Sequence, residues 1–213
     1  MMYRAFAIAG LIALSALPLA RAQAQSPPQR GTARFTAVQA ANLDKVSAYL
    51  NALTSLKSNF VQLGPDGQLD QGEFDLARPG RLRFAYAAPS PTLVVATGGT
   101  VYVQNRRLNT LDRYSLSDLP LGILLNQDVN LKFDRSVVGV EEQPGVLVIH
   151  ARTSTAHTQG NIDLVFSWPL LELRQWKVKD NQGGVTTVAL TGTQTGIKLD
   201  DALFTVPVKA PRK

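Results

Sequence analysis

The chain has 213 residues and a formal net charge of +6, with 45% hydrophobic and 18% charged residues. This balance is typical of a folded globular protein and excludes a disordered chain, which combines low hydrophobicity with high charge. The basic residues are dispersed and only 7% of the residues are aromatic, so the sequence offers neither a basic stripe nor a stacking platform for nucleic acid. Because there is no cysteine, the fold must depend on its buried core without disulfides.

The first residues have the pattern of a secretory signal peptide, which we place at residues 1–24. Arg4 supplies a positive start, residues 5–20 are almost wholly apolar, and small alanines precede Gln25 as a cleavage site requires. A transmembrane anchor is the alternative, but the apolar stretch is shorter than the roughly 20 residues that a spanning helix needs. We therefore expect export, with residues 25–213 forming a single mature domain.

One amphipathic helix followed by many strands is predicted along the mature chain. Apolar residues at helical spacing between Thr36 and Leu56 predict the helix. From Lys57 onward, short apolar runs alternate with turn sequences such as GPDG, RPG and DNQGG, which is typical of strands joined by tight turns. About eleven strands are expected, at 58–63, 68–77, 81–87, 92–97, 100–105, 109–115, 130–140, 146–153, 161–167, 171–179 and 185–195.

The spacing of these strands predicts a mainly β fold with an antiparallel sheet. A parallel sheet needs a helical crossover between successive strands, and most of the gaps here are too short to hold one. So many strands seldom stay flat and open, so we expect a highly curved sheet or a barrel. The apolar sequence LSDLPLGILLN at residues 116–126 interrupts the series. It could cover an apolar surface, or it could be a short helix that plugs the barrel core.

The residue patterns that usually carry catalysis or metal binding do not occur in the sequence. It has no G-x-S-x-G, no H-E-x-x-H and no glycine-rich phosphate loop, and its two histidines, His150 and His157, lie in no recognisable motif. Asp70, Glu73 and Asp75 form an acidic cluster in which a carboxylate pair for glycoside hydrolysis is conceivable. A solvated outer face is favoured, because acids are seldom buried without partners. We expect no enzyme activity, no metal and no cofactor.

The segment 59–89, NFVQLGPDGQLDQGEFDLARPGRLRFAYAAP, resembles the outer-membrane lipoprotein carrier family, LolA. Members of this family show F-x-Q, then a strand ending in R-P, then a strand with an arginine, aromatic residues and a tyrosine. The matching positions are Phe60, Gln62, Gly72, Arg78, Pro79, Arg81, Leu82, Arg83, Phe84, Tyr86 and Pro89. The similarity continues through VVATGGTVYVQN, LPLGILLN and LDDALFTVP and so extends over nearly the whole mature chain.

The resemblance implies a half-open antiparallel β-barrel with an N-terminal helix and a short helical lid. It also implies a monomeric periplasmic carrier that takes acylated lipoproteins from an inner-membrane releasing complex to an outer-membrane receptor. Acyl chains need an apolar site to cross the aqueous periplasm, because burying each CH₂ group away from water lowers the free energy by roughly 0.8 kcal/mol. A carrier or sensor of another lipid or amphiphile is the alternative within this fold. A periplasmic hydrolase is the alternative from another class, and it would have a polar cleft in place of an apolar cavity.

Two sets of site residues are predicted. Arg78 is similar to the family's arginine that hydrogen-bonds the lid in the empty, closed protein, a role that suits a guanidinium with five donors. A surface arginine before a turn proline is the alternative. The cavity is expected to be lined by strand and lid residues, with Val101 as the alternative to Tyr102 because a one-residue shift exchanges the faces of a strand. These residues are Phe60, Leu82, Phe84, Tyr86, Val95, Tyr102, Ile149 and Phe166 on strands, and Leu119, Ile123 and Leu124 on the lid.

Overall fold

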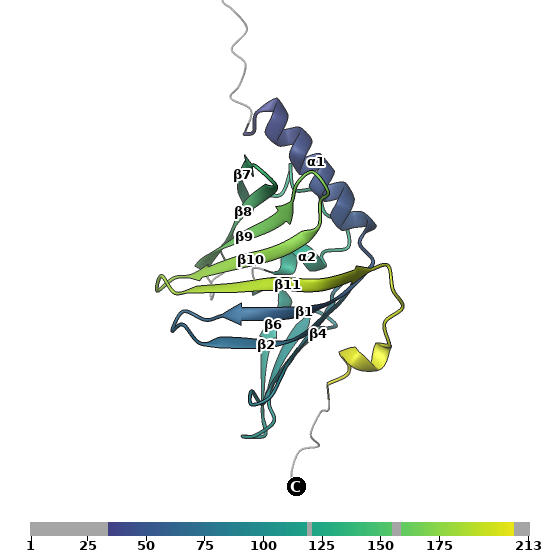
Figure 1. Ribbon diagram of the computed structural model, residues 1–213, viewed down its shortest axis with the longest axis vertical. Helices are drawn as coiled ribbons and strands as arrows, with labels where there is room; N and C mark the ends of the chain where they lie inside the picture. The colour runs from purple at the N-terminus through teal and green to yellow at the C-terminus, as the bar shows by residue number, and fades with distance from the viewer. Residues whose placement is uncertain (1–33, 119–120, 155–158, 207–213) are drawn as a thin grey trace, which may run out of the picture. The chain divides into compact units, whose positions relative to one another are not determined.

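A computed structural model describes residues 34–118, 121–154 and 159–206 of the chain (Figure 1). The predicted signal peptide, Leu119 and His157 lie outside these residues. The described part contains one long helix, α1 (Ala37–Ala52), eleven strands and three shorter helical elements. The predicted mainly β fold is confirmed.

Helix α1 begins at a capping box formed by Thr36 and Gln39. The Thr36 hydroxyl accepts from the Gln39 backbone N–H, while the Gln39 side chain accepts from the Thr36 N–H, so two exposed donors of the first turn are satisfied. The buried side chains of the helix recur at helical spacing and join the main core. The prediction that the helix reaches Leu56 was wrong, because Leu56 already pairs with Leu76 in the first strand pair of the sheet.

The eleven strands follow the predicted series closely, with one substantial difference. They are β1 (Ser55–Leu63), β2 (Leu69–Ala77), β3 (Arg81–Tyr86), β4 (Thr92–Thr97), β5 (Thr100–Asn105), β6 (Thr110–Ser115), β7 (Val137–Gln143), β8 (Val146–Ser154), β9 (Gln159–Ser167), β10 (Leu173–Asp180) and β11 (Val185–Thr195). The strand predicted at 130–140 begins only at Val137, since Asp134 accepts from the backbone N–H and hydroxyl of Ser136. Such local side-chain bonds favour a turn over a strand.

All eleven strands form one antiparallel sheet in the order β6-β5-β4-β3-β2-β1-β11-β10-β9-β8-β7. Strands β6 and β7 are its two edges, so the sheet is not closed. Strands β3 and β10 are four strand spacings apart, roughly 19 Å in a flat sheet. The rings of Phe84 on β3 and Trp176 on β10 nevertheless lie 6.0 Å apart. The sheet is therefore strongly curved, as the predicted half-open barrel requires, and one of its faces is concave.

Between the two edge strands, residues 116–118 and 121–136 lie over the concave face, and we call this segment the crossover. It contains two short helices, η1 (Leu116–Asp118) and α2 (Gly122–Leu125). The crossover is fixed to α1 by hydrogen bonds, in which Asn51 both donates to and accepts from the backbone of Val129 at 2.9 Å. Its apolar side chains Ile123, Leu124 and Leu125 are buried in the main core.

The convex face of the sheet is covered locally by the C-terminal segment. The short helix η2 (Asp201–Phe204) packs Phe204 against Ala77 and Val95 in a second, smaller cluster of buried residues. Arg81 forms an ion pair with Asp201 at 2.5 Å at the margin of this contact. Strands β2, β3 and β4 therefore bury side chains on both faces, whereas most of the sheet has one solvated face.

Gly72 on β2 gives a first testable prediction about the fold. A Cβ atom at this position would lie 2.1 Å from the carbonyl oxygen of Ala85 and 2.8 Å from the ring of Phe60. We expect Gly72→Ala to lower the free energy of unfolding by about 1–3 kcal/mol, because neither neighbour can retreat without moving the sheet or the aromatic core. Urea unfolding would measure the loss, with Gln71→Ala at the exposed neighbouring position as the control. Equal stability of the two variants would contradict the close approach.

Candidate functional site

An apolar pocket of about 280 Å³ lies on the concave face, beside the crossover. Strands β1, β3, β4, β10 and β11 form its walls, and one residue of the crossover, Leu121, contributes to its lining. The residues around it are Gln62, Phe84, Tyr86, Val94, Leu121, Trp176, Val178, Thr186 and Val188. The walls are mainly aliphatic and aromatic, as expected for a site that holds an apolar molecule.

Aromatic rings fill the concave face next to this pocket. Phe84 lies 4.6 Å from Phe74, 5.2 Å from Phe60 and 6.0 Å from Trp176, measured between ring centroids. Several of these pairs have the edge-to-face geometry that aromatic quadrupoles favour. The rings therefore form a continuous packed aromatic layer on the concave face.

The structure brings most of the predicted cavity residues to the concave side. Phe84 and Tyr86 line the pocket itself, and Phe60 packs against both rings. The other residues lie in the main core without lining the pocket: Leu82, Ile149, Phe166, Ile123 and Leu124. Phe166 lies beneath α1, with its ring 6.0 Å from that of Tyr49. Leu119 lies outside the described residues.

Val95 and Tyr102 require correction, because the structure places both on the convex face. In the register of the sheet Val95 is opposite Arg83 and Tyr102, while Ala96 is opposite Leu82 and Val101. Val95 packs beneath the C-terminal segment. On the concave side their places are taken by Val94, which lines the pocket, and by Val101, which is buried in the main core.

The sequence reasoning missed all four pocket residues on the last two strands. Trp176 and Val178 alternate with the lysines of β10, so strand periodicity was a signal that could have found them. Leu121 lies in the apolar insertion, but the residues of this insertion that were predicted to line the cavity were Leu119, Ile123 and Leu124. Gln62 is a polar residue in a mainly apolar wall, but it lies two residues after Phe60 on the same strand, so alternation could have placed it on the same face.

Arg78 connects the turn between β2 and β3 to the crossover. Its Nη2 atom donates to the carbonyl oxygens of Asn126 and Gln127, just beyond α2. In the same turn, the backbone N–H of Gly80 donates to the carbonyl oxygen of Leu125 at 3.0 Å. Burial lowers the pKa of Arg78 below its usual value, an effect that the nearby Asp128 carboxylate opposes. A guanidinium remains charged under these conditions, so the contacts are charge-assisted.

The acidic cluster on β2 is not the solvated face that the sequence favoured. Asp75 has none of its surface exposed and pairs with Arg83 at 2.7 Å, whereas Glu73 is half-exposed and lies 3.5 Å from the same guanidinium. Burial became possible because Arg83 supplies the opposite charge and the C-terminal segment covers the neighbouring positions. The geometry is that of a structural ion pair.

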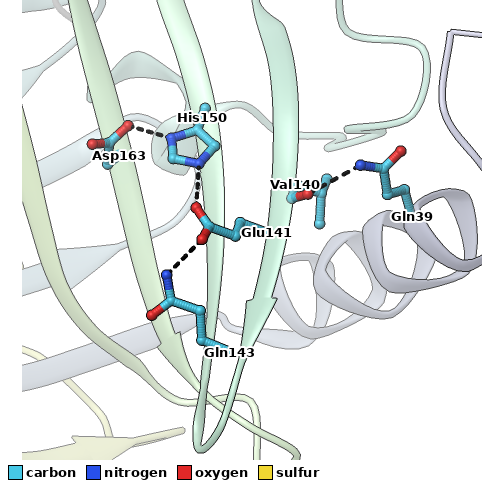
Figure 2. Close-up of polar contacts among 6 residues, drawn as sticks. All are labelled: Gln39, Val140, Glu141, Gln143, His150 and Asp163. Carbon is cyan, nitrogen blue, oxygen red and sulfur yellow. Dashed lines mark hydrogen bonds and ion pairs between the residues drawn. The ribbon is translucent and has the colours of Figure 1, made fainter.

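His150 belongs to a chain of polar contacts on β7, β8 and β9, shown in Figure 2. Its Nδ1 atom lies 2.7 Å from the Asp163 carboxylate, and its Nε2 atom lies 3.6 Å from Glu141, which in turn accepts from Gln143. The contacts of His150 join β8 to its neighbours β7 and β9, whereas the Gln143–Glu141 contact lies within β7, so the set is a local array on the sheet surface. Among the residues described, no group of three or more histidine or acidic side chains is arranged to hold a metal ion.

The described residues thus form a curved, open antiparallel sheet with an apolar pocket next to a helical crossover. Residues 51–207 match the family model described as outer membrane lipoprotein carrier protein LolA. The match covers more than half of the chain, so the protein belongs to this family, and the predicted membership is confirmed. No helix of the described residues is long and apolar enough to cross a membrane.

Individual relatives agree with the family. The outer-membrane lipoprotein carrier protein of Shewanella sediminis is 28% identical over 182 residues, covering 79% of this chain and 84% of the relative. The protein of the same name from Alkalilimnicola ehrlichii is 26% identical over 188 residues, covering 79% and 80%. Among solved structures, a LolA superfamily protein from Nitrosomonas europaea covers 80% of this chain and 99% of its own, with 13% identity and a TM-score of 0.40.

Proposed function

We propose that the protein is a periplasmic carrier that holds the acyl chains of lipoproteins on the concave face of its sheet. Family membership supports lipoprotein as the cargo, and the apolar pocket beside the crossover is the observation that carries the proposal. In this role the protein receives its cargo from an inner-membrane releasing complex and delivers it to an outer-membrane receptor. The predicted signal peptide at residues 1–24 would bring it to the periplasm. Its task is transport rather than catalysis.

The small size of the pocket supports the proposal that the described arrangement is a closed one. Pockets for drug-sized ligands occupy roughly 300–1,000 Å³, and the volume here is about 280 Å³. Several acyl chains therefore need more room than the closed pocket offers. Displacing Leu121 and α2 would uncover the buried side chains of the core and enlarge the site without breaking any strand pair.

The contacts of Arg78 suit a latch that closes reversibly. Its Nη2 atom holds the crossover, but its Nε and Nη1 atoms are buried with no hydrogen-bond partner among the residues described. A buried donor without a partner destabilises an arrangement by roughly 1–3 kcal/mol. This penalty offsets part of the stabilisation from the latch. The closed and open forms would then lie close enough in free energy for cargo to shift the balance.

Substitution of Leu121 tests the pocket. An apolar fluorescent dye such as phenylnaphthylamine should brighten on binding the protein and be displaced by a diacylated peptide. We expect Leu121→Asp to raise the dissociation constant of the dye at least tenfold, because a carboxylate in an apolar wall is strongly unfavourable. The control is Leu108→Asp, the same change at a residue that is 69% exposed in the turn between β5 and β6. Equal dye binding by both variants would place the ligand elsewhere.

A carrier or sensor of another amphiphile could use the same pocket. Protein purified from its own periplasm would retain whatever it binds there. Mass spectrometry of the extracted material separates the two functions, since acylated peptides and free lipids differ in mass. Free lipid alone would favour the second function.

A further inference from the structure

A second, larger hollow adjoins the apolar pocket at the end of the sheet remote from Arg78. Its volume is about 520 Å³, and Gln62 and Tyr86 line both spaces. The hollow also contains Gln68 and Asp70 from the start of β2 and its preceding turn, and Arg107 from the turn between β5 and β6. We call this hollow the polar vestibule.

Gln62 and Tyr86 form the boundary between the two spaces. The Tyr86 hydroxyl donates to Oε1 of Gln62 at 2.8 Å, while the tyrosine ring packs 5.0 Å from Phe60 on the apolar side. Burial, and to a smaller extent the Asp70 carboxylate, raises the pKa of Tyr86, so its hydroxyl is a neutral donor near pH 7. An amphiphile that spans this boundary would place its hydrocarbon chain against the aromatic rings of the apolar pocket. Its polar part would contact the hydroxyl, amide and charged groups of the vestibule.

The chemistry of the vestibule favours a peptide over a phosphate-bearing headgroup. It contains both a carboxylate, Asp70, and a guanidinium, Arg107, so its charges are balanced. Arg107 is held at the rim by donating to the carbonyl oxygen of Pro89 at 3.1 Å. A phosphate would gain the arginine but face the carboxylate, whereas ester carbonyls can accept from such a lining and amide groups can both accept from it and donate to it.

We propose that the polar vestibule binds the acylated cysteine and the first peptide units of a lipoprotein while its acyl chains occupy the apolar pocket. This inference rests on the proposed function and adds a second recognition site to it. The carrier would then distinguish an acylated polypeptide from a bare hydrocarbon by polar contacts to Arg107, Gln62 and their neighbours. The apolar pocket contains no charged group that could contribute to this distinction.

Arg107→Ala tests the vestibule without touching the apolar pocket. Binding of phenylnaphthylamine is compared with binding of a synthetic peptide, dipalmitoylglyceryl-cysteinyl-seryl-glycine amide. We expect Arg107→Ala to weaken peptide binding about tenfold and to leave dye binding unchanged, because a hydrogen bond to a charged group is lost only for the peptide. The matched control is Arg106→Ala, an exposed neighbour outside the vestibule lining, which should change neither.

A second measurement uses the absence of cysteine from the chain. Ser90→Cys puts a single thiol in the vestibule, and Gln143→Cys puts one at the end of β7, outside the vestibule lining. Bound peptide should slow alkylation at position 90 at least fivefold and leave position 143 unaffected, whereas the dye should protect neither.

The outcomes separate the two proposals. If wild-type protein binds neither dye nor peptide, the carrier function itself fails. If both bind but Arg107→Ala matches wild type and position 90 stays reactive, the vestibule assignment is overturned while the carrier function stands. Tighter binding of dipalmitoylphosphatidylglycerol than of the peptide, lost in Arg107→Ala, would instead assign the vestibule to a lipid headgroup and overturn the peptide.

Discussion

Arg78→Leu is expected to load acylated peptide at close to the wild-type level but to transfer it to an outer-membrane acceptor at least tenfold more slowly. The substitution removes the hydrogen bonds from Nη2 to the carbonyl oxygens of Asn126 and Gln127. Hydrogen bonds to a charged group contribute roughly 1.5–3 kcal/mol each, so the balance shifts towards the open form. Opening favours uptake. Release is slowed, because closure over an empty pocket no longer helps to expel the cargo.

Uptake and transfer have to be measured separately, by dye displacement for the first and by passage of labelled lipopeptide to acceptor vesicles or receptor for the second. Arg81→Leu is the matched control, since Arg81 follows the same turn but pairs with Asp201 on the convex face. Both variants should unfold cooperatively. A wild-type transfer rate for Arg78→Leu would mean that Arg78 only stabilises the turn before Pro79.

Much of the fold could be predicted from local sequence because the strands are joined by short, recognisable turns. Ten of the eleven observed strands lie within a few residues of the predicted ranges. The exception, before Val137, arises where Asp134 bonds locally to Ser136, a contact that periodicity does not reveal. The first part of the crossover was recognisable in the sequence because an apolar insertion separates two consecutive predicted strands where a tight turn would have been enough.

The lining of the site was harder to predict, since it depends on which face each strand turns inward. Strands β4 and β5 have apolar residues at adjacent positions, such as Val94 and Val95, so alternation alone did not decide between them. The structure gives the reason: Phe204 and its neighbours cover the convex face there, and Val95 is buried on that side. A segment more than 100 residues away in the chain therefore determines the inward face.

The same covering segment underlies a prediction about stability. Arg83→Met should lower the free energy of unfolding by about 3–5 kcal/mol, because it leaves the Asp75 carboxylate buried without its charged partner. Asp75 has no exposed surface, and its Oδ1 atom already has no hydrogen-bond partner among the residues described. Within the described part of the chain, the contact of Oδ2 with Arg83, at 2.7 Å, is the one ion pair that compensates the buried charge.

The double variant Asp75→Leu/Arg83→Met distinguishes a buried ion pair from simple loss of packing. Replacing both partners by apolar groups removes the unpaired charge, so most of the stability lost in Arg83→Met should return. Arg81→Leu serves as the surface comparison, because its partner Asp201 is 87% exposed and such pairs contribute less than about 1 kcal/mol. Urea unfolding of wild type, Asp75→Leu, Arg83→Met and the double variant gives the coupling energy of the pair directly. If Arg83→Met and Arg81→Leu proved equally mild, Asp75 would have to be solvated in solution, and the C-terminal segment would not cover the convex face as described.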